Sequence, residues 1–84
     1  MIEKEAIVAC EKGLQARSVS RLIKITMSFK SNIVITYDGK KADAKSLLNV
    51  LALKVPKGVT ITISASGEDE VLAVDELVKF VSLH

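Results

Sequence analysis

Hydrophobic and polar positions along the chain follow two different periods, which predicts strands and helices in alternation. Apolar residues recur at every second position in residues 2–10, interrupted only by Lys4, which predicts a half-buried strand; the same alternation in 59–66 predicts a strand with one wet face. A run rich in β-branched residues at 32–37 predicts a third strand. Apolar spacings of three and four over residues 16–27 predict an amphipathic helix. Its expected apolar face comprises Ala16, Val19, Leu22, Ile23 and Met27.

Turn residues divide the rest of the chain into short elements. Asp38-Gly39 is a strong hairpin signal, which makes residues 40–43 the returning strand. An apolar run predicts a short helix over 46–53, and Val55-Pro56-Lys57-Gly58 predicts a turn after it. The acidic segment Glu68-Asp69-Glu70 marks the start of a last helix, where the helix dipole favours negative charge. Its expected core face comprises Ala73, Val74, Leu77, Val78 and Val81.

The resulting element order, βαββαβα, indicates a two-layer α/β (α+β) fold. Such a sheet buries one face under helices and leaves the other face to water. A ferredoxin-like βαββαβ arrangement is the nearest alternative, and the extra C-terminal helix argues against it. With 84 residues and a mass of 9.1 kDa, the chain has room for one domain, residues 1–84.

Composition narrows the class of protein further. The net charge of +2 is too small to imply nucleic-acid binding by itself. No apolar run approaches the roughly 18 residues of a membrane-spanning helix, and the N-terminus does not resemble a secretory signal. Cys10 is the only cysteine and cannot form an internal disulfide, so we expect a cytoplasmic protein.

The residues of most catalytic and metal sites are missing from the sequence. His84 is the only histidine and is the last residue, which excludes a serine triad and a zinc-ligand set. Cys10 continues the apolar parity of the first strand and is expected to act as a small hydrophobe. We therefore expect no catalytic residue, no metal and no cofactor.

Basic residues near the first helix form one candidate binding feature. Gly13-Leu14-Gln15-Ala16-Arg17 joins a loop to a helix N-terminus, where backbone N–H groups lack partners and attract anions. Arg17, Arg21 and Lys24 then lie on one exposed stripe. The alternative interpretation of the stripe is an ordinary solvated helix face.

Ser46 and the leucines after it form the other candidate feature. Ser46 stands at the N-cap position of its helix, where a serine commonly serves only as a cap. The same position tolerates a phosphate, because added negative charge is favourable there. Leu47, Leu48 and Leu51 leave the helix apolar on more sides than one sheet can cover, which predicts an exposed docking patch.

These motifs together resemble the HPr family of the bacterial phosphotransferase system. The resemblance rests on residues 13–17, on Asp38-Gly39-Lys40-Lys41, on Ala44-Lys45-Ser46 with the leucine-rich helix, and on 67–70. It runs the length of the chain in the same element order. It implies the HPr-like open-faced β-sandwich, with a four-stranded antiparallel sheet covered on one face by three helices.

The sequence differs from the family at the position that matters for phosphotransfer. The family carries phosphate on a histidine, and Gln15 occupies that position here. A carboxamide is not nucleophilic, so this side chain cannot take part in histidine-type phosphotransfer. With glutamine at position 15 the sequence is similar to the Crh type of the family, which keeps a regulatory serine that matches Ser46. Ser18 and Asn49 also depart, from a proline and a glycine, and Leu48 from a methionine.

The Crh-type resemblance implies a regulatory protein of carbon catabolite repression and no enzyme. Ser46 would be phosphorylated by HPr kinase/phosphorylase, and the phosphoserine form would act as corepressor of a CcpA-like, LacI-type transcription regulator. We expect no direct binding to nucleic acid or to a membrane, and no small-molecule substrate. The expected partner-binding residues are Arg17, Ser20, Arg21, Lys24, Lys45, Leu47, Leu48 and Leu51.

Two other functions remain as alternatives. The first is a phosphocarrier in an atypical phosphotransferase chain, which would need an acceptor other than Gln15 and has only the His84 imidazole. The second is a ferredoxin-like module that binds a small molecule, which the lack of a glycine-rich ligand loop disfavours.

Overall fold

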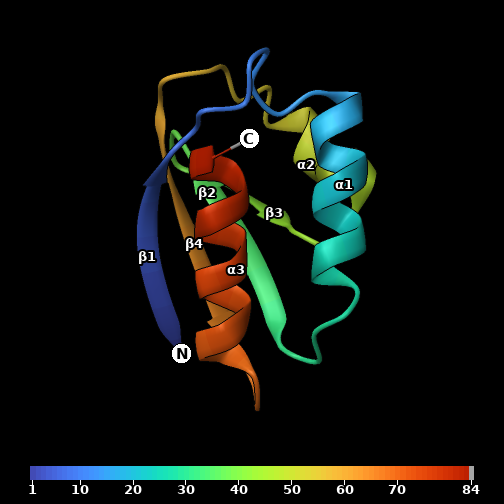
Figure 1. Ribbon diagram of the computed structural model, residues 1–84, viewed down its shortest axis with the longest axis vertical. Helices are drawn as coiled ribbons and strands as arrows, with labels where there is room; N and C mark the ends of the chain where they lie inside the picture. Colours follow the sequence, from blue (N-terminus) through green and yellow to red (C-terminus); the bar gives the residue numbers. More distant parts are fainter. Residues whose placement is uncertain (84) are drawn as a thin grey trace.

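The computed structural model, which describes residues 1–83, has a sheet on one side and three helices on the other (Figure 1). The four strands are all antiparallel and lie in the order β1-β4-β2-β3. No helix among the described residues is long and apolar enough to cross a membrane. In chain order the elements are β1 (Ile2–Ile7), α1 (Ala16–Thr26), β2 (Asn32–Tyr37), β3 (Lys40–Asp43), α2 (Leu47–Ala52), β4 (Thr60–Ser66) and α3 (Glu70–Leu83).

The element order and the two-layer arrangement predicted from the sequence are confirmed. The ferredoxin-like alternative is excluded, since β1 lies at an edge of the sheet and α3 follows β4 to pack on its buried face. The hairpin between β2 and β3 turns at Asp38 and Gly39, whose φ angles of 53° and 76° are those of a type I′ turn.

The core lies between the sheet and the helices. Alternate residues of β2 and β4, among them Ile33, Ile35, Ile61 and Ile63, are fully buried. The opposite parity of β4 carries hydroxyl side chains on the open face, as the alternation predicted. Lys4 interrupts the apolar parity of β1, and its Nζ lies 2.8 Å from the Asp75 carboxylate on α3. An edge position makes this charge acceptable because the side chain reaches past the core to a partner.

The buried face of α1 differs from the predicted one. Ala16 and Met27 were expected in the core and are exposed, Met27 by 64%. The residues buried instead include Thr26, whose hydroxyl donates to the Ala44 carbonyl at 2.9 Å. That acceptor lies two residues before Ser46. The error arose because apolar spacing cannot identify a polar residue that is buried through a tertiary hydrogen bond.

The core face of α3 was predicted correctly except at two positions. Val78 is only half-buried, and Phe80, which was not included, is buried. Glu70 begins the helix, and its carboxylate accepts the backbone N–H of Gly67 at 3.2 Å. Position 69 has a further role beside this helix start, because its carboxylate bonds to a distant loop.

Asp69 joins the start of α3 to the loop between α1 and β2. Its carboxylate accepts the backbone N–H groups of Lys30 and Ser31 at 2.9 and 3.0 Å, and also the Ser31 hydroxyl. Bonds from the Ser31 hydroxyl and the Lys30 N–H stabilise the ionised form and lower the pKa of Asp69 to about 2. We call this group of three residues the Asp69 clasp.

The clasp predicts a specific acid dependence of stability. Because the folded-state pKa lies below the ordinary value of 3.8, the contribution of Asp69 is complete above that value and is lost as the pH falls towards about 2. Asp69→Asn should therefore be less stable than the parent at pH 7 and should lose less stability across this interval. Urea denaturation at a series of pH values measures both. Glu68→Gln, which removes an exposed neighbouring carboxylate, should leave the acid dependence unchanged; an equal effect would contradict the assignment.

The backbone conformation of Lys54, just after the C-cap of α2, predicts a stabilising substitution. Lys54 has φ of 52°, in the left-handed region that disfavours a residue with a Cβ. Lys54→Gly should raise the free energy of unfolding by about 0.5–1 kcal/mol, measured by urea denaturation. Lys57→Gly removes the same charge from the same loop at a residue without positive φ, and should not stabilise. Equal stabilisation by both would mean that charge repulsion, rather than backbone strain, is the cause.

Candidate functional site

The loop that presents Gln15 is fixed by close packing of its backbone. Leu14 is buried, and its N–H donates to the Val55 carbonyl at 2.8 Å. Gly13 has φ of 73°, and a Cβ there would lie 2.2 Å from the same carbonyl oxygen. The loop before α1 therefore rests directly on the connection between α2 and β4. Gln15 follows as the N-cap of α1, with an exposed side chain.

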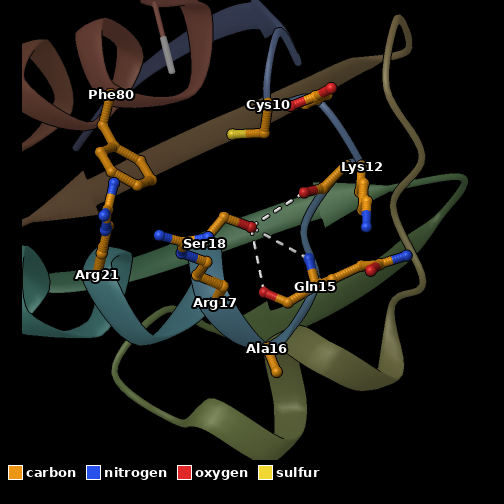
Figure 2. A pocket seen from close by; sticks show the side chains of 10 residues that line it. Cys10, Lys12, Gln15, Ala16, Arg17, Ser18, Arg21 and Phe80 are labelled. Carbon is orange, nitrogen blue, oxygen red and sulfur yellow. Dashed lines mark hydrogen bonds between the residues drawn. The ribbon is translucent and has the colours of Figure 1, made fainter.

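Ser18 completes the first turn of α1. Its hydroxyl oxygen accepts the Gln15 N–H at 3.1 Å, and its proton is directed to the Gly13 carbonyl at 2.9 Å, with the Gln15 carbonyl at 3.1 Å as a second acceptor (Figure 2). The Gln15 N–H, which also donates to the Gly13 carbonyl at 3.1 Å, is thus satisfied from within the turn. A serine at this position is therefore compatible with a well-formed helix start.

A cavity of about 570 Å³ opens beside this helix start. Its floor includes the buried side chains of Cys10 and Phe80, and its walls carry Lys12, Arg17 and Arg21 (Figure 2). The floor residue Phe80 comes from α3. Sequence periodicity could not predict that this helix lies next to residues 10–21. Burial raises the pKa of the Cys10 thiol, so the thiol is neutral at pH 7 and not a nucleophile.

The predicted basic stripe on α1 is present. Arg17, Ser20, Arg21 and Lys24 are all exposed, and no described residue forms an ion pair with the three cations. Arg17 and Arg21 border the cavity, whereas Lys24 lies one turn further along the helix. A second hollow includes Gln15 together with Leu51 and Lys54, so the start of α1 and the end of α2 lie side by side.

Ser46 is the N-cap of α2, as predicted. Its hydroxyl accepts the Asn49 N–H at 3.4 Å, a long bond that leaves the oxygen weakly held. The segment before it is tied down at both sides: Lys45 Nζ donates to the Phe29 carbonyl at 2.8 Å, and Asp43 accepts the Lys45 N–H at 2.9 Å. The half-buried Lys45 ammonium is thus committed to a backbone carbonyl rather than free beside the serine.

The leucines of α2 divide into exposed and packed positions. Leu48 is 77% exposed and Leu47 42%, as the apolar surplus of this helix predicted. Leu51 is half-buried: it packs against the core and also lines the second hollow, so it is less accessible than the predicted anchor. The core contact of α2 is completed by Val50, which is fully buried. The exposed patch of α2 therefore consists of Leu47 and Leu48.

The two predicted features lie at separate places. Ser46 lines neither of the two hollows that Gln15 borders. Among residues 1–83, no group of three or more acidic, cysteine or histidine side chains is placed to hold a metal ion. His84, the one imidazole and the acceptor in the alternative phosphocarrier hypothesis, lies outside the described residues.

Comparison with known proteins places this geometry in a family. Residues 2–82 match the family model "PTS HPr component phosphorylation site". HPr-like protein Crh of Halalkalibacterium halodurans is 38% identical over 81 residues, which are 96% of each chain. Phosphocarrier protein HPr of Haemophilus influenzae is 38% identical over 81 residues, which are 96% of this chain and 95% of that one.

The fold agrees with solved structures of the same family. The crystal structure of a phosphocarrier protein HPr from Bacillus anthracis matches with a TM-score of 0.93 at 32% identity, covering 95% of each chain. The similarity thus covers all seven elements, together with the loop at Gln15 and the segment at Ser46. The chain belongs to the HPr family of the bacterial phosphotransferase system, among relatives that include both phosphocarrier HPr and HPr-like Crh.

Proposed function

We propose that this chain is a Crh-type regulatory protein, switched by phosphorylation of Ser46 and unable to carry phosphohistidine. The single observation that carries the proposal is Gln15, exposed at the start of α1 at the position that corresponds to the phosphoacceptor of the family. The amide nitrogen lone pair is delocalised into the carbonyl, so the side chain cannot attack a phosphoryl donor. The protein would then act by binding rather than by catalysis.

Ser46 has the features of a regulatory phosphorylation site. Its side chain is partly accessible, and its hydroxyl makes one long bond that is easily given up. A phosphate would add a charge of about −1.5 to −2 at pH 7 with three strong acceptor oxygens. The modifying enzyme would be HPr kinase/phosphorylase, acting in the cytoplasm.

Leu48 and Leu47 would supply the apolar part of the partner interface. They stand directly after Ser46 and are exposed before and after modification, so the phosphate supplies the discrimination between the two states. The exposed basic face of α1 would contribute a polar rim through Arg17, Ser20, Arg21 and Lys24. The partner would be a CcpA-like, LacI-type transcription regulator in carbon catabolite repression.

A second candidate function is a phosphocarrier in an atypical phosphotransferase chain. It is favoured by the relatives named phosphocarrier protein HPr. It requires an acceptor other than Gln15, and His84 is the only imidazole in the sequence. The first experiment below separates this function from the regulatory one.

Incubation with phosphoenolpyruvate and Enzyme I should leave the protein unphosphorylated, because Gln15 replaces the nucleophile. Gln15→His should gain partial, acid-labile phosphorylation, since the bonds of Ser18 keep the loop and the helix start in place. Intact-mass spectrometry at neutral and at acid pH measures both. Acid-labile phosphate on the parent chain would contradict the regulatory proposal, and its loss in His84→Ala would assign the carrier role to His84.

ATP and HPr kinase should modify Ser46, and the modified protein should bind a CcpA-like regulator at least tenfold more tightly than the unmodified one. Peptide mass mapping locates the phosphate, and calorimetric titration compares the two forms with Ser46→Ala. Leu48→Ser should weaken binding of the phosphorylated form without lowering its urea midpoint, because this side chain is exposed. Equal affinity of all forms would reduce Ser46 to a helix cap.

A further inference from the structure

The segment that carries Ser46 is attached to the end of α1 by two hydrogen bonds that run in opposite directions. Thr26, the last residue of α1, donates from its hydroxyl to the Ala44 carbonyl at 2.9 Å. Lys45 reaches back and donates from Nζ to the Phe29 carbonyl at 2.8 Å. Both bonds join parts of the chain that are distant in sequence, so the position of residues 44–46 depends on α1 and not only on the helix that follows them.

The bond from Thr26 is shielded from water. Thr26 and Ala44 are both fully buried, and the Ala44 carbonyl accepts no other hydrogen bond from residues 1–83. The Ala44 N–H donates to the Ile33 carbonyl on β2 at 2.9 Å, so this residue is the point where the segment leaves the sheet and meets α1. Without the hydroxyl, the Ala44 carbonyl would be buried without a partner until the segment moved towards water.

The bonds of Ser46 itself do not link it to α1. Its hydroxyl accepts the Asn49 N–H at 3.4 Å, which is a weak bond. Its N–H donates to the Asp43 carbonyl at 3.0 Å, within the same turn of the chain. The orientation of the peptide between Ala44 and Lys45, from which Ser46 follows, is therefore fixed from outside the segment.

We propose that Thr26 is a positioning residue for phosphorylation of Ser46. This inference rests on the proposed function, because it takes Ser46 as the residue that the kinase modifies. By orienting the peptide that follows Ala44, the Thr26 hydroxyl keeps Ser46 in the conformation that the kinase binds. Without the hydroxyl this conformation would be one of several, and the apparent affinity of the kinase would fall in proportion to its population.

The chemistry of the transfer would not change. The bond between the γ-phosphorus of ATP and its bridging oxygen breaks as the bond to Ser46 Oγ forms, ADP leaves, and the hydroxyl proton passes to a base of the kinase. Thr26 is fully buried and so does not contact ATP or the kinase. Its loss should therefore raise KM and leave kcat nearly unchanged, whereas loss of a residue that acts on the reacting atoms would lower kcat.

Thr26→Val tests the proposal, because valine has nearly the shape of threonine without the hydroxyl. In kinetic assays with HPr kinase at saturating ATP, KM should rise about tenfold and kcat should change less than about twofold. Thr26→Ser keeps the hydroxyl and should have a KM within about twofold of the parent value. Ser28→Ala is the matched control, since the Ser28 hydroxyl donates to the Ile25 carbonyl at 2.6 Å and makes no bond to residues 44–46; its KM should equal that of the parent.

Amide hydrogen exchange gives a second readout that does not depend on the kinase. In Thr26→Val the amides of Lys45 and Ser46 should exchange about tenfold faster than in the parent, because the segment opens more often in a chain that stays folded. Urea denaturation checks that each variant is folded under the assay conditions. Thr26→Ala makes the same test if valine beside the two carbonyls unfolds the chain.

Three results would overturn the positioning role. The first is a parental KM for a folded Thr26→Val, the second is a fall in kcat in place of the rise in KM, and the third is an equal rise in KM for Ser28→Ala. Absence of phosphate on the parent chain would refute the proposed function, and this role with it. Modification of the parent with an unchanged KM for Thr26→Val would refute the positioning role alone.

Discussion

The sheet has one apolar face, and three helices of unequal length have to cover it. The longest, α3, packs across β1, β4 and β2, which leaves the remaining area to α1 and the six-residue α2 together. These two helices consequently lie side by side (Figure 1). The packing of the Gly13 and Leu14 backbone against Val55 then follows, and with it the exposed position of Gln15. Placement of the functional residues is thus a result of core coverage.

The regular elements could be predicted because their signals are local. The strand at Asn32–Tyr37, the turn at Asp38-Gly39 and the cap at Ser46 each depend on a few adjacent residues, and the structure has all three in place. Thr26 and Asp69 could not be predicted in the same way. Each is held by a partner far along the chain, and hydrophobic periodicity contains no information on such partners.

The candidate site likewise has parts that could be predicted from local sequence and parts that depend on tertiary packing. The importance of Gln15 and Ser46 follows from residue chemistry within a motif, which is readable from sequence. The cavity floor depends on Phe80, which comes from the last helix and is far along the chain from the loop before α1, and only the folded chain brings them together. Leu51 shows the converse error: helix composition indicated surplus leucines but not which of them the core would take. Burial is decided by tertiary packing, so composition alone could give their number and not their identity.

The Asp69 clasp has a consequence for the kinetics of folding. It links positions 38 residues apart, and its acceptor and donors follow β4 and precede β2, two strands that pair directly. The clasp cannot close until that pairing has formed, so it is expected to be absent from the early folding nucleus. An interaction that forms late slows unfolding without speeding folding. The clasp would thus lengthen the lifetime of the native state. It lies near the end of α1 opposite to Gln15, so the residues that slow unfolding and those expected to bind partners at the start of α1 are at different ends of the molecule.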